Sequence, residues 1–257
     1  MWQVHVEIML NLSLEDLLFA ALSPICATAF LVVCLGFMYV DIRGVPVCIA
    51  KQKIQPRDRP TCDDYSGLGS ILLQNTLVAY CVAPPLTVLV YRLAGVTLTL
   101  PSSIVCGLVE FGASAIVYDI WFGLVHMAFH HPKLYSLHKV HHEWKSPCAF
   151  EGAYFHVLDF ILGNYFPMLF LPLVVTRSYY VILTFGCLGV ASVAITHSGY
   201  DMRSLCWFAG PFKPSLRHDS HHEFFNINFS TFGALDIICG TYLSEDDVVE
   251  RRSKAKK

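Results

Sequence analysis

Apolar segments long enough to cross a lipid bilayer constrain the fold of this chain more than any other feature. A membrane-spanning helix needs about 20 consecutive apolar residues, and runs of that length cover residues 17–40, 68–91 and 101–126, with a longer run over 156–197. The composition agrees, because 54% of the residues are hydrophobic and only 15% are charged, unlike an ordinary soluble domain. The sequence therefore predicts an all-α, polytopic membrane bundle.

The number of crossings depends on how the prolines and the longest run are interpreted. Pro84-Pro85 should kink the second span or end it early, because proline removes a helical hydrogen bond. The run 156–197 is long enough for a hairpin that turns at 176–178, with irregularities at Pro167 and Pro172 in its first arm. The alternative is one span plus a re-entrant segment. We expect about four to five transmembrane helices, with five crossings if the hairpin forms.

The loop charges predict an orientation in the membrane. Short cytoplasmic loops collect Lys and Arg, and the loop 41–60 carries Arg43, Lys51, Lys53, Arg57 and Arg59, whereas no Lys or Arg precedes the first span. This places the N-terminus outside. Five crossings then place the loop 131–155 and the segment from residue 198 onward in the cytosol, so that both lie on the same side of the membrane. A re-entrant segment would instead separate them.

Those two segments contain most of the histidine. Three clusters stand out: His126-x-x-x-His130, His138-x-x-His141-His142 and His218-x-x-His221-His222. Residues three and four apart share one face of a helix, so each cluster can direct its rings to one point. His197 ends the last apolar run and His156 begins the fourth. The number of rings predicts a cytosolic, histidine-rich cap that holds two metal ions.

The residue types narrow the metal without fixing it. Imidazole suits iron, zinc, copper and nickel, and the clusters lack the dense carboxylates that magnesium and calcium require. Iron would allow oxygen activation, whereas zinc would supply a bound hydroxide for hydrolysis. A site beside apolar helices suits an insoluble substrate. Asp219 and Glu143 are the preferred candidates to orient the ligand rings, and His131 points away from its neighbour His130 and is a further candidate.

In these motifs the chain resembles the fatty acid hydroxylase superfamily of membrane di-iron oxygenases. That superfamily includes sterol C4-methyl oxidases, cholesterol 25-hydroxylase, sterol C5-desaturases and sphingoid-base hydroxylases. The resemblance covers residues 101–245, where the three histidine clusters occur in the family's order and are followed by Asn228-Phe229 and by Asp236 with Gly240-Thr241-Tyr242. It divides the chain into an N-terminal transmembrane region (1–100), a catalytic domain (101–245) and a charged tail (246–257).

The resemblance implies an oxidoreductase that uses two irons, O2 and electrons from NAD(P)H. A cytochrome b5-type protein with its reductase would deliver the electrons in the endoplasmic reticulum membrane, since no haem or flavin domain is visible in the sequence. The residues that match the family's metal ligands are His126, His130, His138, His141, His142, His197, His218, His221 and His222, with His156 as a second-tier member.

The substrate is less defined than the metal site. The segment 197–200 resembles the sterol-oxidising members, and His156 matches the methyl oxidases and sphingoid-base hydroxylases, whereas residues 201–204 depart from the sterol enzymes. We expect hydroxylation or oxidation of a sterol or related lipid, with a sphingoid-base or fatty-acyl hydroxylase as the alternative. Two other classes stay open: a zinc-dependent membrane lipid hydrolase, and a non-catalytic protein with a structural metal. A net charge of −2 with scattered basic residues argues against nucleic-acid binding.

Overall fold

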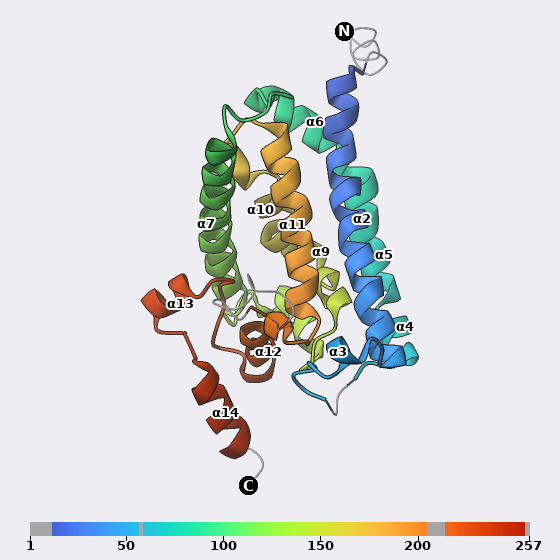
Figure 1. The fold of residues 1–257 in the computed structure, drawn as a ribbon, viewed down its shortest axis with the longest axis vertical. Coiled ribbons are helices and arrows are strands. Elements are labelled where there is room, and N and C mark those ends of the chain that lie inside the picture. The colour runs from blue at the N-terminus through green and yellow to red at the C-terminus, as the bar shows by residue number, and fades with distance from the viewer. Residues whose placement is uncertain (1–11, 57–58, 205–213, 255–257) are drawn as a thin grey trace.

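The chain forms an elongated helical bundle with its short helices gathered at one end (Figure 1). The computed structural model describes residues 12–56, 59–204 and 214–254. Within those ranges the only β pairing consists of two isolated bridges, Lys53 with Tyr200 and Thr97 with Ser178. Four helices are long and apolar enough to cross a membrane: Leu14–Arg43, Gly69–Ala94, Ile104–Phe129 and Tyr179–His197. The prediction of an all-α bundle with membrane-spanning helices is confirmed.

The first long helix, α2 (Leu14–Arg43), has well-formed ends. Ser13 and Asp16 form a capping box at its start, and Gly44 ends it with a left-handed φ of 68°, which glycine adopts without steric cost. One side of the helix is buried against α6 and α11, and the other exposes apolar side chains such as Val32 and Leu35. An apolar outer surface is what a helix in contact with lipid requires.

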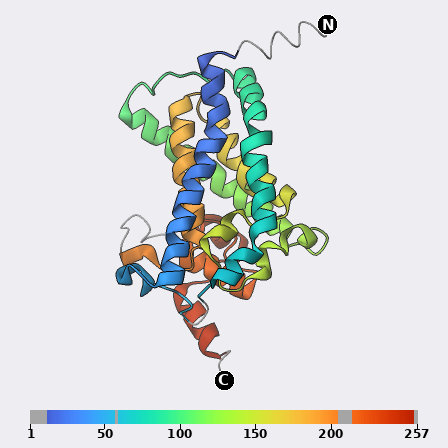
Figure 2. The same cartoon turned by 90° about the vertical axis from the view of Figure 1, so that its right-hand side faces the viewer.

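The second long helix is continuous but changes its hydrogen-bonding pattern. It begins as α5 (Gly69–Leu77), passes through a π-helical turn η1 (Val78–Val82) and continues as α6 (Ala83–Ala94). Pro84 and Pro85 lie at the start of α6. They lack the N–H groups that would close the preceding turn, and the π turn absorbs this loss. Pro84-Pro85 therefore mark a π turn and do not end the span. Figure 2 shows this helix beside α2 along the bundle.

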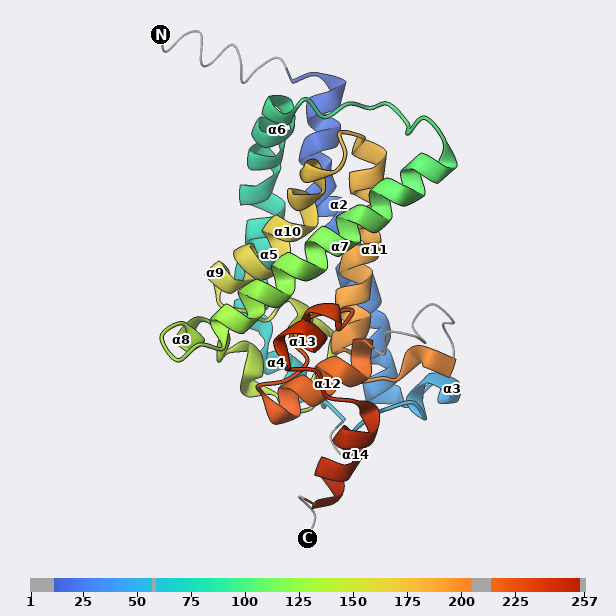
Figure 3. The ribbon, with the colours of Figure 1, turned by 90° about the vertical axis from the view of Figure 1, so that its left-hand side faces the viewer.

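The third and fourth long helices both run towards the histidine end of the bundle, and they cross obliquely in Figure 3. They are α7 (Ile104–Phe129) and α11 (Tyr179–His197), and a broken segment joins them in Figure 3. This segment consists of α9 (Val157–Asp159), the π-helical η4 (Phe160–Tyr165), α10 (Phe166–Leu169) and the 3-10 helix η5 (Leu171–Val174). This arm is shorter than the four long helices, since its continuous apolar helix covers Val157–Leu169, and Pro167 and Pro172, where irregularities were expected, lie near its end.

The broken segment nevertheless returns the chain to the far end of the bundle, as the hairpin interpretation requires. The turn before α11 pairs with the α6–α7 linker, since the Thr97 N–H donates to the Arg177 carbonyl and the Tyr179 N–H donates to the Thr97 carbonyl. The chain then descends through α11 to His197. The segments before and after this excursion therefore lie at the same end of the molecule.

Short elements build that end. They are α3 (Val47–Ala50), α4 (Cys62–Gly67), α8 (Tyr135–His138), the 3-10 helices η2 (His141–Glu143), η3 (Ala149–Ala153) and η6 (Met202–Ser204), α12 (Pro214–Phe224), α13 (Ala234–Cys239) and α14 (Glu245–Lys254). The loop after α2 joins them through Lys53. Its buried ammonium donates to Asp41 and to the Ser198 carbonyl, both at 3.2 Å. Lys53, counted above as a loop charge, is thus a buried ion-pair partner.

Candidate metal centre

Four segments bring the histidines to one place. His126 lies in the last turn of α7 and His130 caps its end; α8 and η2 carry His138, His141 and His142; His197 ends α11; and α12 carries His218, His221 and His222. Their nitrogens fall into two groups that could each hold a metal ion. Within each group the candidate ligand atoms lie within 4.8 Å of one another.

The first group contains five rings: His126, His130, His138, His142 and His221. Its centre is the Nε2 atom of His142, which lies 3.1 Å from Nε2 of His130, 3.0 Å from that of His138 and 3.1 Å from that of His221. His126 completes the group, and its buried Nε2 has no hydrogen-bond partner.

The second group contains four rings: His141, His197, His218 and His222. Nε2 of His218 lies 2.8 Å from Nε2 of His197 and 3.0 Å from that of His222, which in turn lies 3.1 Å from that of His141. The two groups are adjacent, because His141 and His142 are neighbours in the chain and α12 contributes His221 to one group and His218 and His222 to the other.

In five rings, the hydrogen bond made by the outer nitrogen, Nδ1, fixes the protonation state of the inner nitrogen, Nε2. In four rings Nδ1 lies within hydrogen-bonding distance of a backbone carbonyl: His126 with Phe229 (2.8 Å), His197 with Val193 (2.8 Å), His221 with Ile227 (2.7 Å) and His222 with Trp144 (3.0 Å). In the fifth ring, Nδ1 of His138 lies 2.6 Å from the Asp159 carboxylate. A carbonyl can only accept a hydrogen bond, so each of these neutral rings carries its proton on Nδ1 and directs an Nε2 lone pair inward.

Lone pairs that face each other repel unless a cation lies between them. The inner Nε2 atoms lie 2.8–3.1 Å apart within each group. A neutral ring can carry at most one proton on Nε2, which is too few for His142, with three such neighbours, and for His218, with two. A metal ion bound to both nitrogens removes the conflict, and the outer hydrogen bonds then orient the rings as in known metal sites. The donor set fits two metal ions that favour imidazole, such as iron or zinc.

The electrostatics of the rings agree with this. Burial lowers the pKa of His130 to about 3. Burial, together with the neighbouring rings, lowers the pKa of His138, His141, His218 and His221 well below the ordinary value. The rings are therefore neutral near pH 7, which is the form that binds a metal.

The loop after α12 supplies two of the carbonyls and is held in shape by Asp236. This buried carboxylate accepts hydrogen bonds from the Phe229 N–H (2.7 Å), the Ser230 N–H (2.9 Å) and Arg217 (2.6 Å), and Asp119 accepts from the next two backbone N–H groups. Asn228, whose φ is 53°, accepts from the Leu243 N–H. Asn228 and Asp236, which follow the last histidine cluster in the sequence, thus act through the backbone, because they hold the loop whose carbonyls orient His126 and His221.

The candidates for orienting the rings differ from the sequence expectation. Asp219 pairs with Arg252 and Gln55, and burial raises its pKa to about 6; Glu143 accepts from the Tyr154 hydroxyl at 3.0 Å. Neither contacts a ligand ring in a recorded hydrogen bond. Asp159 takes that role instead, through His138. Nearness in sequence favoured Asp219 and Glu143, whereas the contact to Asp159 depends on how α9 packs.

Two further histidines lie outside both groups. The ring of His131 is exposed and accepts from the Lys133 N–H at 3.3 Å, and the ring of His156 caps α9 by accepting from the Leu158 N–H at 3.2 Å. The backbone carbonyls of Trp144, Val193, Ile227 and Phe229 were not among the sequence candidates, since a main-chain acceptor leaves no residue-type signal.

The histidines lie in a region that matches a known protein family. The sequence model of the fatty acid hydroxylase family matches residues 111–241, just over half of the 257-residue chain and all of the histidines in both groups. The chain belongs to the fatty acid hydroxylase family. No solved structure gave a significant match.

Its relatives within the fatty acid hydroxylase family carry different names. The chain is 33% identical over 221 residues to fatty acid hydroxylase ahd1 of Mycosarcoma maydis, covering 80% of this chain and 52% of that protein. Methylsterol monooxygenase 1 of Rattus norvegicus is 33% identical over 148 residues, covering 56% and 50%, and the human fatty acid hydroxylase domain-containing protein 2 is 31% identical over 150 residues, covering 58% and 41%. The chain thus spans about half the length of the curated relatives it matches.

Proposed function

We propose that this protein is a membrane di-iron oxygenase that hydroxylates or oxidises a lipid with O2 and external electrons. The observation that carries the proposal is the pair of histidine groups with their Nε2 lone pairs directed inward. Membership of the fatty acid hydroxylase family supports it, as do relatives named hydroxylase and monooxygenase. The proposed iron ligands are the nine histidines of the two groups, and His156 is left out because its ring caps α9.

Two bound irons would supply the oxidising power that activation of O2 and cleavage of a C–H bond require. The chain's own contribution is to hold the ligands and to keep water away. A small cavity beside His126, His138 and His141 is lined by Phe122, Phe129 and Phe155. Apolar walls next to the metal groups exclude water from a reactive site and accept the hydrocarbon part of a lipid.

We further propose a sterol or related lipid as substrate, with a sphingoid base or fatty acyl chain as the alternative. A cytochrome b5-type protein with its reductase would donate the electrons. Residues 101–245 would form the catalytic domain on the transmembrane region 1–100, with 246–257 as a charged tail. The family resemblance favours a multi-pass protein of the endoplasmic reticulum membrane, and the loop charges favour an orientation with the histidines on the cytosolic side.

Metal analysis of the purified full chain tests the proposal. We expect about two irons per chain, with metal and product lost in His138→Ala and His221→Ala. The control is His131→Ala, which removes a histidine outside both groups and should retain iron. Full turnover by His138→Ala would refute the proposal. Zinc in place of iron, with activity that needs no oxygen, would instead identify a hydrolase, and a stable metal without oxygen uptake over a lipid panel would indicate a structural site.

Lipid profiles of cells with and without the gene would identify the substrate. A precursor that accumulates in its absence should be consumed by the purified protein when NADPH, cytochrome b5 and its reductase are added. Methylsterol, sphingoid-base and fatty-acid fractions would be compared in the same extracts.

A further inference from the structure

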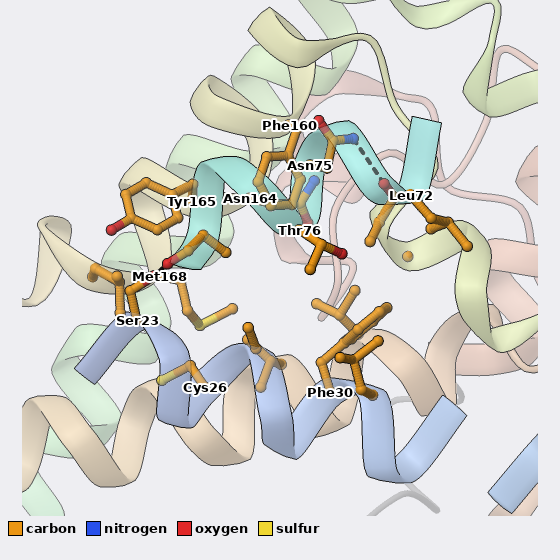
Figure 4. Close-up of a pocket in the computed structure, with 18 residues that line it drawn as sticks. Ser23, Cys26, Phe30, Leu72, Asn75, Thr76, Phe160, Asn164, Tyr165 and Met168 are labelled. Carbon is orange, nitrogen blue, oxygen red and sulfur yellow. Dashed lines mark hydrogen bonds between the residues drawn. The ribbon is translucent and has the colours of Figure 1, made fainter. Parts of the chain in front are cut away.

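A second, larger cavity lies within the membrane-spanning part of the bundle, on the other side of η4 from the cavity beside the histidines. It encloses about 730 Å³, a figure that includes its opening to the outside, and α2, α5, η3, η4 and α11 line it (Figure 4). Phe160 and Asn164 of η4 face this cavity, whereas Asp159 and Gly163 line the one beside the metal groups.

The walls are apolar except for a few groups, and two of those have unmet hydrogen-bonding capacity. Asn75 is 1% exposed, and its Nδ2 donates to the carbonyls of Ala153 and Phe155, both at 2.9 Å. These two acceptors fix the orientation of the amide. They leave its Oδ1 buried without a partner, and Nδ2 of Asn164 is buried without one too. By contrast, Ser23 donates to the Ala79 carbonyl at 2.7 Å and is satisfied.

A buried acceptor and a buried donor without partners are both costly, because each has lost its hydrogen bonds to water without a replacement. Figure 4 shows Asn75 and Asn164 on the side of the cavity opposite Cys26 and Phe30. A hydroxyl group complements them, because it can donate to an amide oxygen and accept from an amide nitrogen. A carboxylate or an ether cannot donate, and an ammonium cannot accept.

The surroundings indicate that the hydroxyl belongs to a lipid. The helices that enclose the cavity expose Val32, Leu35, Leu73 and Leu77 on their outer faces, so a ligand would enter from hydrocarbon. Cys26, Phe30 and Met168 provide the apolar surface for the rest of the molecule.

We propose that this cavity binds a membrane lipid alcohol, with its hydroxyl held by Asn75 and Asn164. The site is separate from the proposed oxidation. Gly152 lies in the cavity wall, and a Cβ built on it would be 3.3 Å from Nδ1 of His197. His197 itself lines the cavity beside the metal groups and is not among the residues that line this one.

Binding to the purified full chain in nanodiscs tests the proposal with matched probes. One series is radiolabelled cholestanol, its 3-methyl ether and cholestane, and the other is hexadecanol, its methyl ether and hexadecane. We expect the alcohol to bind more tightly than the ether and the ether more tightly than the hydrocarbon, by roughly tenfold for each hydrogen bond. The series that shows this order identifies a sterol or a long-chain alcohol as the ligand type.

Variants separate the two amides. Asn164→Leu should make the ether and the hydrocarbon bind alike, and Asn75→Leu should make the alcohol and the ether bind alike. Ser23→Ala, which removes a pocket hydroxyl that is already paired, should leave the order unchanged. Because Asn75→Leu also removes two hydrogen bonds to the chain, its iron content and melting temperature are measured, and Asn164→Leu tests the proposal if that variant does not fold.

Equal binding of all three probes in both series, or no binding, would overturn the proposal and indicate that water satisfies the two amides. Iron is measured on the same preparations. A preserved order without iron would contradict the proposed oxygenase alone, whereas iron with equal binding would contradict the lipid site alone.

Discussion

Replacement of Asp159 by asparagine tests the link between the helix packing and the metal centre. The Asp159 carboxylate lies 2.6 Å from Nδ1 of His138, and both side chains are 3% exposed. Burial raises the pKa of Asp159 well above its ordinary value, so the comparison is made at a pH at which the carboxylate is ionised. Asparagine keeps the size and one acceptor oxygen but removes that charge. His138 would keep its place in the first metal group, with a weaker hydrogen bond behind it.

The structure gives the size of the effect. A hydrogen bond to a charged group contributes about 1.5–3 kcal/mol and a neutral one about 0.5–1.5 kcal/mol. The difference of about 1–2 kcal/mol corresponds to roughly a 5- to 30-fold loss of metal affinity. This overlaps the range of about 10–100-fold found when residues that support a metal ligand are changed.

The assay is competition for iron against a graded series of chelators, with Glu143→Gln as the matched control. Glu143 is next to His142 in sequence, yet its carboxylate accepts from the Tyr154 hydroxyl. We expect a weakened first site in Asp159→Asn and an unchanged one in Glu143→Gln. The reverse result, or equal affinity in both variants, would refute the assignment of Asp159 as the positioning residue.

Three further outcomes follow from the packing and the charges. Gly152→Ala should lower the free energy of unfolding by about 1–3 kcal/mol through overpacking, since the new Cβ would lie 2.8 Å from a methyl group of Val193. Gly112→Ala is the control, because its Cβ would meet no atom within 4 Å, and thermal unfolding in detergent compares the two variants. Arg217→Met leaves the buried Asp236 without its countercharge and should lower the free energy of unfolding by about 3–5 kcal/mol. An unchanged free energy of unfolding would contradict a stabilising role for this ion pair. The pKa of His130 is about 3 in the folded chain, against an ordinary 6.5, so the unfolded chain binds a proton first as the pH falls. The melting temperature of the metal-free protein should therefore decrease from about pH 7 to about pH 5. A melting temperature that does not change with pH would contradict the neutral state of the rings.

Much of the metal centre could be predicted from the order of residues. His218 and His222 share one face of α12 because they are four residues apart, and the same is true of His126 and His130 at the end of α7. The length of the apolar run 156–197 allowed the chain to leave the histidine end and come back to it. These are local properties of helices, and spacing along the chain determines them.

Other features could not be predicted, because they depend on groups far apart in sequence. The division of the rings into five and four arises where α12 meets η2, so that the neighbours His141 and His142 belong to different groups.

The sequence by itself determined the apolar helices and the number and spacing of the imidazoles, because these depend only on residue type and on the separation of residues close together in the chain. Only the tertiary structure decided which nitrogen points inward in five of the rings, those of His126, His138, His197, His221 and His222. That choice is made by the carbonyls of Trp144, Val193, Ile227 and Phe229 and by Asp159, which packing brings to the outer edge of the rings. Backbone acceptors are the same in every residue, so their role appears only once the chain is folded.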